Sequence, residues 1–133
     1  MAVHRFEELI AWQRARVLAR EVYDVTARDA FRKDFGLSGQ IQRAAVSTMA
    51  NIAEGFEKGR PTEFGRYLDI ARGSLAEVRS HLYIAMDVGY INDSDLNRLL
   101  TLVDETGKVL AGLRRAQTRA VSPGTGYQAP GTP

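Results

Sequence analysis

The sequence contains no cysteine, and this absence excludes disulfide bonds, thiolate metal sites and cysteine nucleophiles together. No apolar run approaches the ~20 residues that a membrane-spanning helix needs. The N-terminal stretch carries charges at Arg5, Glu7 and Glu8, where a secretion signal would have an apolar core. We therefore expect a cytoplasmic protein without a membrane partner.

Strong charge of one sign is also absent. The 18 basic and 16 acidic residues leave a net charge of only +2, so a single copy lacks the basic surface of a strong nucleic-acid-binding domain. Arginine supplies 15 of the 18 cations, and its planar guanidinium suits bidentate phosphate contacts. Several copies assembled together would present these arginines on a larger and more positive surface.

Motifs for catalysis and cofactor binding are missing as well. The sequence has no phosphate-binding loop and no dinucleotide-binding glycine pattern. Glu77 and His81 stand four residues apart on an expected helix, but two side chains are too few for a metal site. We interpret them as a surface pair. We expect no enzymatic activity, no cofactor and no metal.

The hydrophobic pattern that is present has helical spacing. Apolar residues recur every three or four positions, and period-two alternation is absent. The segments with this spacing span residues 6–26, 37–56, 64–85 and 96–113. Short breaks at residues 59–62 and 89–92 make consecutive helices antiparallel. The sequence predicts an all-α fold, an antiparallel up-down-up-down four-helix bundle formed by residues 1–119.

The helix ends and the C-terminus carry local signals. Thr62 is a candidate N-cap, and Asn92, followed three residues later by Asp95, has the spacing of a capping box. Residues 120–133 hold three prolines, three glycines and no charge, which predicts a flexible tail. The 133 residues, 44% of them apolar, fit one domain and this tail.

One expected helix carries a line of polar residues among small ones: Gln40, Ser47, Asn51 and Glu54. Two interpretations are open, a hydrogen-bonded packing face between helices or subunits, and a ligand pocket. The small neighbours favour packing. The candidate oligomer or helix-packing residues are Ser47, Asn51, Glu54 and Phe56.

Apolar residues also outnumber what one narrow bundle core requires. The surplus positions are Ile10, Val17, Val25, Val46 and Phe56. They predict an apolar strip outside the core of the monomer, and such a strip favours self-association.

Five arginines are candidate nucleic-acid-binding residues: Arg43, Arg60, Arg66, Arg72 and Arg79. Two interpretations are open, a solvated helix face with an Arg66–Asp69 pair, and a track for phosphates. Acidic neighbours favour the solvated face. Aromatic residues at helical spacing are interpreted as core side chains rather than base-stacking platforms: Tyr23, Phe56, Tyr67 and Tyr83.

Several motifs occur together in order. They are Phe6-x-x-Leu9-x-x-Trp12-x-x-Ala15, Gln42-Arg43-Ala44-Ala45-Val46-Ser47, Asn51-Ile52-Ala53-Glu54-Gly55, Phe64, Ile70-Ala71-Arg72-Gly73-Ser74-Leu75-Ala76-Glu77 and Gly89-Tyr90-Ile91. Over residues 5–115 this combination resembles the four-helix bundle protein family, also called the 23S rRNA intervening-sequence protein or S23 family. The accessory variability determinant of diversity-generating retroelements is a relative of that family.

The resemblance implies a cytosolic antiparallel four-helix bundle that assembles as a homopentameric ring, with no enzymatic activity attached to the family. The retroelement relative binds nucleic acid and a reverse transcriptase through a basic ring surface. We therefore expect a non-enzymatic homo-oligomeric scaffold, a pentamer by resemblance, that serves as a nucleic-acid or ribonucleoprotein accessory protein. Its expected partners are further copies of itself, RNA or DNA, and a reverse transcriptase-like or other protein. The alternative is a protein-binding adaptor with no nucleic-acid affinity.

Overall fold

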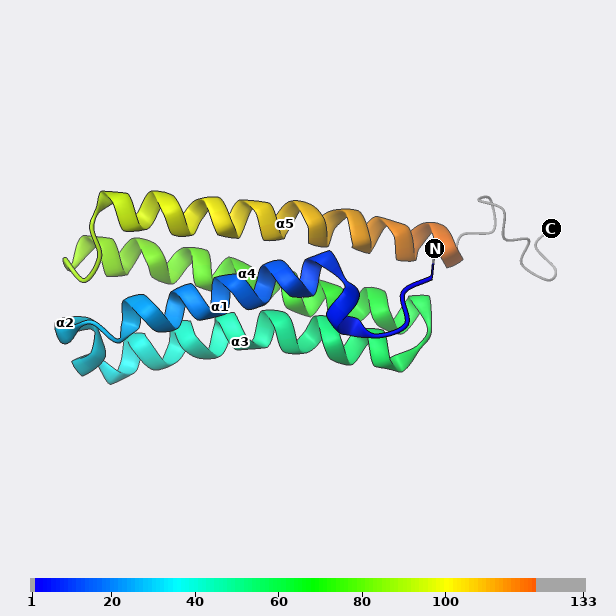
Figure 1. The fold of residues 1–133 in the computed structure, drawn as a ribbon, viewed down its shortest axis with the longest axis horizontal. Coiled ribbons are helices and arrows are strands. Elements are labelled where there is room, and N and C mark those ends of the chain that lie inside the picture. Colours follow the sequence, from blue (N-terminus) through cyan, green and yellow to red (C-terminus); the bar gives the residue numbers. More distant parts are fainter. Residues whose placement is uncertain (1, 122–133) are drawn as a thin grey trace.

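The computed structural model describes residues 2–121, and these residues form helices and turns with no strand among them. The elements in order are η1 (Phe6–Glu8), α1 (Ile10–Thr26), α2 (Asp29–Lys33), α3 (Phe35–Lys58), α4 (Pro61–Asp87) and α5 (Asp93–Val121). The four long helices lie lengthwise beside one another (Figure 1). The prediction of an all-α fold is confirmed.

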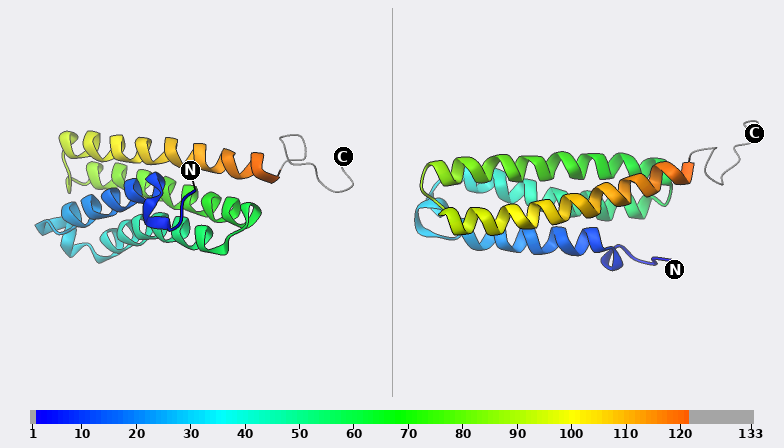
Figure 2. Two further views of the ribbon diagram at one scale, coloured as in Figure 1. Left: turned by 45° about the vertical axis from the view of Figure 1, so that its right-hand side comes forward. Right: turned by 90° about the horizontal axis from the view of Figure 1, so that it is seen from above.

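Each long helix packs against two others. α3 contacts α1 and α4, and α5 contacts α1 and α4, which encloses one core between the four helices (Figure 2). Fully buried side chains come from every long helix: Leu18, Ile41, Ile52, Leu68, Leu82, Leu99 and Leu110. Burying one such side chain stabilises the fold by roughly 1.5–3 kcal/mol, so this core is the main source of stability.

The first predicted helix is divided. Residues 6–8 form a 3₁₀ turn, Leu9 is extended, and the α-helix starts only at Ile10. Phe6 packs edge to face against Trp12, with ring centroids 5.2 Å apart. The periodic apolar pattern continues across Leu9 because the turn folds back onto the helix that follows it.

A short helix that the sequence pattern did not predict, α2, joins α1 to α3. Its Phe31 is fully buried and stacks on Tyr90 at a centroid distance of 5.1 Å. Five residues are too few to reveal a helical period. The adjoining Asp34 caps α3 by accepting a hydrogen bond from the Leu37 backbone N–H at 3.0 Å.

The predicted capping box at the start of α5 is confirmed. The Asn92 side chain accepts from the Asp95 backbone N–H at 2.9 Å, and Asp95 accepts from the Asn92 backbone N–H at 3.1 Å. The predicted Thr62 cap is wrong. Pro61 occupies the first turn of α4, Arg60 is the N-cap without a side-chain bond, and the proline ring presets the helical φ.

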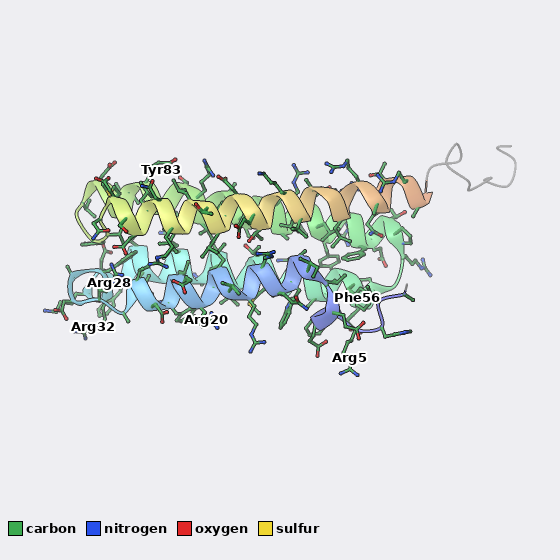
Figure 3. All side chains as sticks on the ribbon, turned by 45° about the horizontal axis from the view of Figure 1, so that its top comes forward. Arg5, Arg20, Arg28, Arg32, Phe56 and Tyr83 are labelled. Atoms are coloured by element: carbon green, nitrogen blue, oxygen red, sulfur yellow. The ribbon has the colours of Figure 1, made fainter. Side chains whose placement is uncertain are left out.

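Asp95 also ties α1 to α5. Arg28 donates to both of its carboxylate oxygens, at 2.5 and 3.1 Å, and Arg98 donates to Asp95 and to Glu21 on α1. The Arg28 hydrogen bonds, aided by the Asn92 N–H and Arg98, lower the pKa of Asp95 to about 2. This cluster lies at the end of the molecule where α2 lies (Figure 3).

The last helix extends into the first two residues of the predicted tail. α5 continues through Ala120 and Val121, because no helix breaker occurs before Ser122 and Pro123. The rest of the predicted tail, residues 122–133, lies outside the described residues. No helix within residues 2–121 is both long and apolar enough to cross a membrane.

Two expectations about apolar and aromatic side chains are corrected. Val25 is fully buried, whereas Ile10 and Val46, predicted for the same outer strip, are 52% and 40% exposed. Tyr23 and Tyr83 are 48% and 45% exposed rather than core. Tyr83 is labelled in Figure 3. Helical spacing places a residue near an apolar stripe, but tyrosines at its margin keep their hydroxyl in water.

Candidate nucleic-acid interface

The five candidate arginines occupy α3, the connection to α4, and α4 itself. Arg43, Arg60, Arg66 and Arg72 are exposed and make no ion pair with another residue in the range 2–121. Arg79 is half-buried and donates to Asp104 on α5 at 2.7 Å, which raises the pKa of its guanidinium. Four of the five are therefore open to an incoming anion, and the fifth is already paired.

A basic corner forms where α3 meets α4, comprising Lys58, Arg60 and Arg66. The Lys58 ammonium and the Arg66 guanidinium lie 5.8 and 5.0 Å from the centroid of the Tyr67 ring. The Tyr67 hydroxyl donates to Glu54 at 3.3 Å. Cations held against an aromatic face keep their charge available to a second partner on the solvent side.

A groove between α4 and α5 brings Arg72 and Arg79 together. It encloses about 430 Å³ and is also lined by Lys108 and Asp104, over a floor of small and apolar residues: Leu75, Ala76, Val103, Gly107 and Ala111. The charged side chains around it are three cations and one carboxylate, so an anion is favoured there.

The predicted Arg66–Asp69 pair does not form. Asp69 instead accepts hydrogen bonds from Arg114 on α5, at 2.9 and 3.2 Å. Similar ion pairs cross the α1/α5 contact at Arg14–Glu105. Asp69 pairs with Arg114 because the planar guanidinium of Arg114 donates to both carboxylate oxygens of Asp69. Such a bidentate contact is stronger than a single hydrogen bond.

The polar line on α3 lies against α4 inside one chain. The hydroxyls of Ser47 and Ser74 are 2.9 Å apart, and the Asn51 amide donates to the Ser47 carbonyl at 2.8 Å and to its hydroxyl at 3.0 Å. Phe56 packs edge to face with Phe64 on α4, with centroids 6.0 Å apart. Ser47, Asn51, Glu54 and Phe56 thus all contact α4 or their own helix within this chain.

A second, smaller pocket lies between α3 and α4. It encloses about 240 Å³ and is lined by Gln40, Arg43, Ala44, Ser47, Glu77 and His81. Sequence reasoning interpreted Glu77 and His81 as a surface pair and gave Arg43 as a candidate nucleic-acid-binding residue on a separate helix. It missed their convergence, because they lie on two helices whose relative rotation has no signal in either helix alone.

Across residues 2–121 no group of three or more histidine, aspartate or glutamate side chains converges as metal ligands do.

The comparisons with known proteins agree with the all-helical fold. A family model described as 23S rRNA-intervening sequence protein matches residues 7–112. The chain belongs to this family.

A solved structure with a similar fold is that of a protein of unknown function from the S23 ribosomal protein family of Bacteroides thetaiotaomicron. It superposes with a TM-score of 0.73 at 22% identity, covering 80% of this chain and 99% of that one. At this identity the likeness establishes the fold alone. No curated protein matches this chain.

Proposed function

We propose that this protein is a non-enzymatic, homo-oligomeric scaffold of the cytoplasm, an antiparallel up-down-up-down four-helix bundle whose arginine surface binds RNA or DNA. The observation that carries the proposal is that Arg43, Arg60, Arg66 and Arg72 are exposed and have no carboxylate partner within the described range. A guanidinium without a carboxylate partner binds phosphate without first giving up an ion pair.

Self-association would supply the positive electrostatic potential that a single copy lacks. A single chain carries a net charge of +2, and a homopentamer, the assembly that the family resemblance implies, repeats every open arginine five times. Ile10, Val46 and Ile70, at 52%, 40% and 43% exposure, offer apolar surface that a neighbouring copy would bury. Assembly and nucleic-acid binding are thus linked in this proposal.

The test is fluorescence anisotropy with a labelled single-stranded RNA at rising salt. We expect binding at low salt that weakens as salt increases, because bound phosphates release counterions. The double variant R66E/R72E should lower the affinity at least tenfold and flatten the salt dependence, since two phosphate contacts become repulsive.

The matched control is R16E/R20E on α1, which makes the same charge change at arginines without carboxylate partners among the described residues. Arg20 lies on the α1 side of the molecule (Figure 3). An equal loss in both double variants would contradict a localised site on α4. Absence of binding at low salt would overturn the nucleic-acid proposal.

The second candidate, a protein-binding adaptor, is favoured by a different feature. An apolar groove of about 450 Å³ lies where the N-terminal segment meets α5, lined by Val3, Glu8, Leu9, Ile10, Ala11, Val109, Gly112 and Leu113. Such a groove suits an apolar helix or peptide better than phosphate. A stable oligomer that ignores RNA and binds a protein at this groove would support the adaptor.

A further inference from the structure

We infer that the pocket between α3 and α4 binds one unpaired guanine base of a single-stranded RNA. The inference rests on the proposed function for the phosphate contacts, whereas the base contacts come from Gln40, Arg43, Glu77 and His81. It adds a base-reading site to a surface otherwise suited to phosphate.

Four polar side chains that line this pocket make no hydrogen bond with the rest of the described chain. None of Gln40, Arg43, Glu77 and His81 hydrogen-bonds or ion-pairs through its side chain with another residue in the range 2–121. Ser47, on the same wall, is by contrast satisfied by Ser74 and Asn51. Opposite charges pair across the other helix contacts, as Arg79 does with Asp104, yet Arg43 and Glu77 share one pocket without pairing.

Gly39 leaves room for the guanidinium of Arg43. A Cβ at Gly39 would lie 3.0 Å from Arg43 Nη1, closer than nearly all side-chain contacts allow. The arginine therefore folds back along α3 in a position that a larger residue at 39 would disturb.

The charges of the pocket favour a base over a phosphate. Arg43 and Glu77 carry opposite charges, so the pocket attracts an anion less than the unpaired arginines on α4 do, and it offers donors and an acceptor side by side. Guanine matches this pair: its O6 and N7 accept from an arginine fork, and its N1–H and N2–H₂ donate to a carboxylate. Adenine lacks the O6 acceptor, and uracil lacks the amino donor.

The size and the neighbours of the pocket fit a base at the end of a phosphate track. A volume of about 240 Å³ is below the ~300–1,000 Å³ of sites for drug-sized ligands. The imidazole of His81 offers a ring face against which a base can stack, as unpaired RNA bases do on aromatic side chains. Arg66 lies on the same stripe of α4 as Glu77, about three turns away, where it can hold a phosphate of the same strand.

The experiment measures anisotropy with an oligouridine that carries one central guanosine, and with the same oligonucleotide carrying inosine, which lacks only the 2-amino group. We expect wild-type protein to bind the guanosine strand at least about tenfold more tightly, the lower end of what one hydrogen bond to a charged acceptor contributes. Glu77→Ala should bind both strands equally. Arg43→Lys, which keeps the charge but not the fork, should no longer distinguish guanosine from 7-deazaguanosine.

Arg72→Ala is the matched control, because it removes a phosphate contact and should weaken both strands by the same factor. Salt-sensitive RNA binding with no preference for guanosine would overturn the pocket and leave the proposed function standing. Absence of any RNA binding would overturn both. Guanosine monophosphate that binds as tightly as the oligonucleotide would overturn the RNA assignment and make the ligand a free nucleotide.

Discussion

At the scale of single residues, Asp95 combines two roles that are usually separate. It closes the capping box at the start of α5 and receives Arg28 and Arg98. Replacing it with asparagine keeps the shape but removes the charge that Arg28 requires. We expect Asp95→Asn to lower the free energy of unfolding by about 2 kcal/mol at neutral pH, as measured by urea denaturation.

The pH dependence of the same site has a definite sign. The folded pKa of Asp95 is about 2, below its ordinary 3.8, so its stabilisation is present above about pH 4 and is lost as the pH falls toward 2. The stability difference between wild type and Asp95→Asn should therefore shrink over this interval. The matched control is Asp93→Asn, at an exposed position in the same first turn. A difference that stays constant with pH would contradict this assignment.

Which of these residue contacts could be predicted depends on how far apart the partners lie. Asn92 and Asp95 are three residues apart, and the sequence predicted their reciprocal bonds. Arg28 is 67 residues from Asp95, and Arg114 is 45 from Asp69, so neither partner was identified. A local motif carries its own geometry, whereas a distant partner depends on the rotation of two helices about their axes.

At the scale of elements, one contact between α3 and α4 depends on a glycine. A Cβ at Gly55 would lie 2.6 Å from the Cβ of Tyr67 and 3.0 Å from Cδ1 of Phe64. Gly55→Ala should therefore destabilise the protein by about 1–2 kcal/mol, because steric overlap exceeds the gain in helix propensity. The measurement is the free energy of unfolding from urea titration.

The control for Gly55 lies on the neighbouring helix. Gly73 is also inside a helix, but a Cβ there would meet nothing within 4 Å. Gly73→Ala should stabilise by roughly 0.5–1 kcal/mol through helix propensity alone. Two alanine substitutions of opposite effect would establish that α3 and α4 touch at Gly55, and a stabilising Gly55→Ala would refute it.

Helices could be predicted where the helical spacing of apolar residues extends over several turns. The four long helices follow from apolar spacing over many turns, and the start of α5 from its cap. The short helix α2 was not predicted, because a single helical turn is too short to show a period. The exposure of Tyr23 and Tyr83 was not predicted either, because residues at the margin of an apolar stripe have the same spacing as core residues. For the candidate site, the sequence supplied the arginines as candidates, but it did not show which of them would be exposed without a carboxylate partner.

At the scale of the whole molecule, the proposed self-association requires exposed apolar residues at the contact between copies. Val46 on α3 and Ile70 on α4 are 40% and 43% exposed. Carboxylates introduced at both positions, V46D/I70D, should reduce the light-scattering mass to that of a monomer while helical circular dichroism is retained, because a buried, unpaired charge opposes association.

The control for assembly is Val121→Asp, at the end of α5, where the wild-type side chain is 41% exposed. It should leave the oligomer intact. A wild-type protein that is monomeric in solution would refute the assembly proposal, and an unchanged mass in V46D/I70D would remove these two residues from the interface.

The sequence by itself determined that the chain is helical, where the long helices run, how α5 begins and which family the chain belongs to. These properties depend on periodic spacing, short-range capping and ordered motifs, all of which act along the chain. Only the tertiary structure decided that Arg79, Asp69 and Asp95 are paired, that Arg43 and Glu77 share a pocket without pairing, and that Val25 is buried. Those outcomes depend on the relative rotation and register of neighbouring helices, which many weak contacts set together and no single segment encodes.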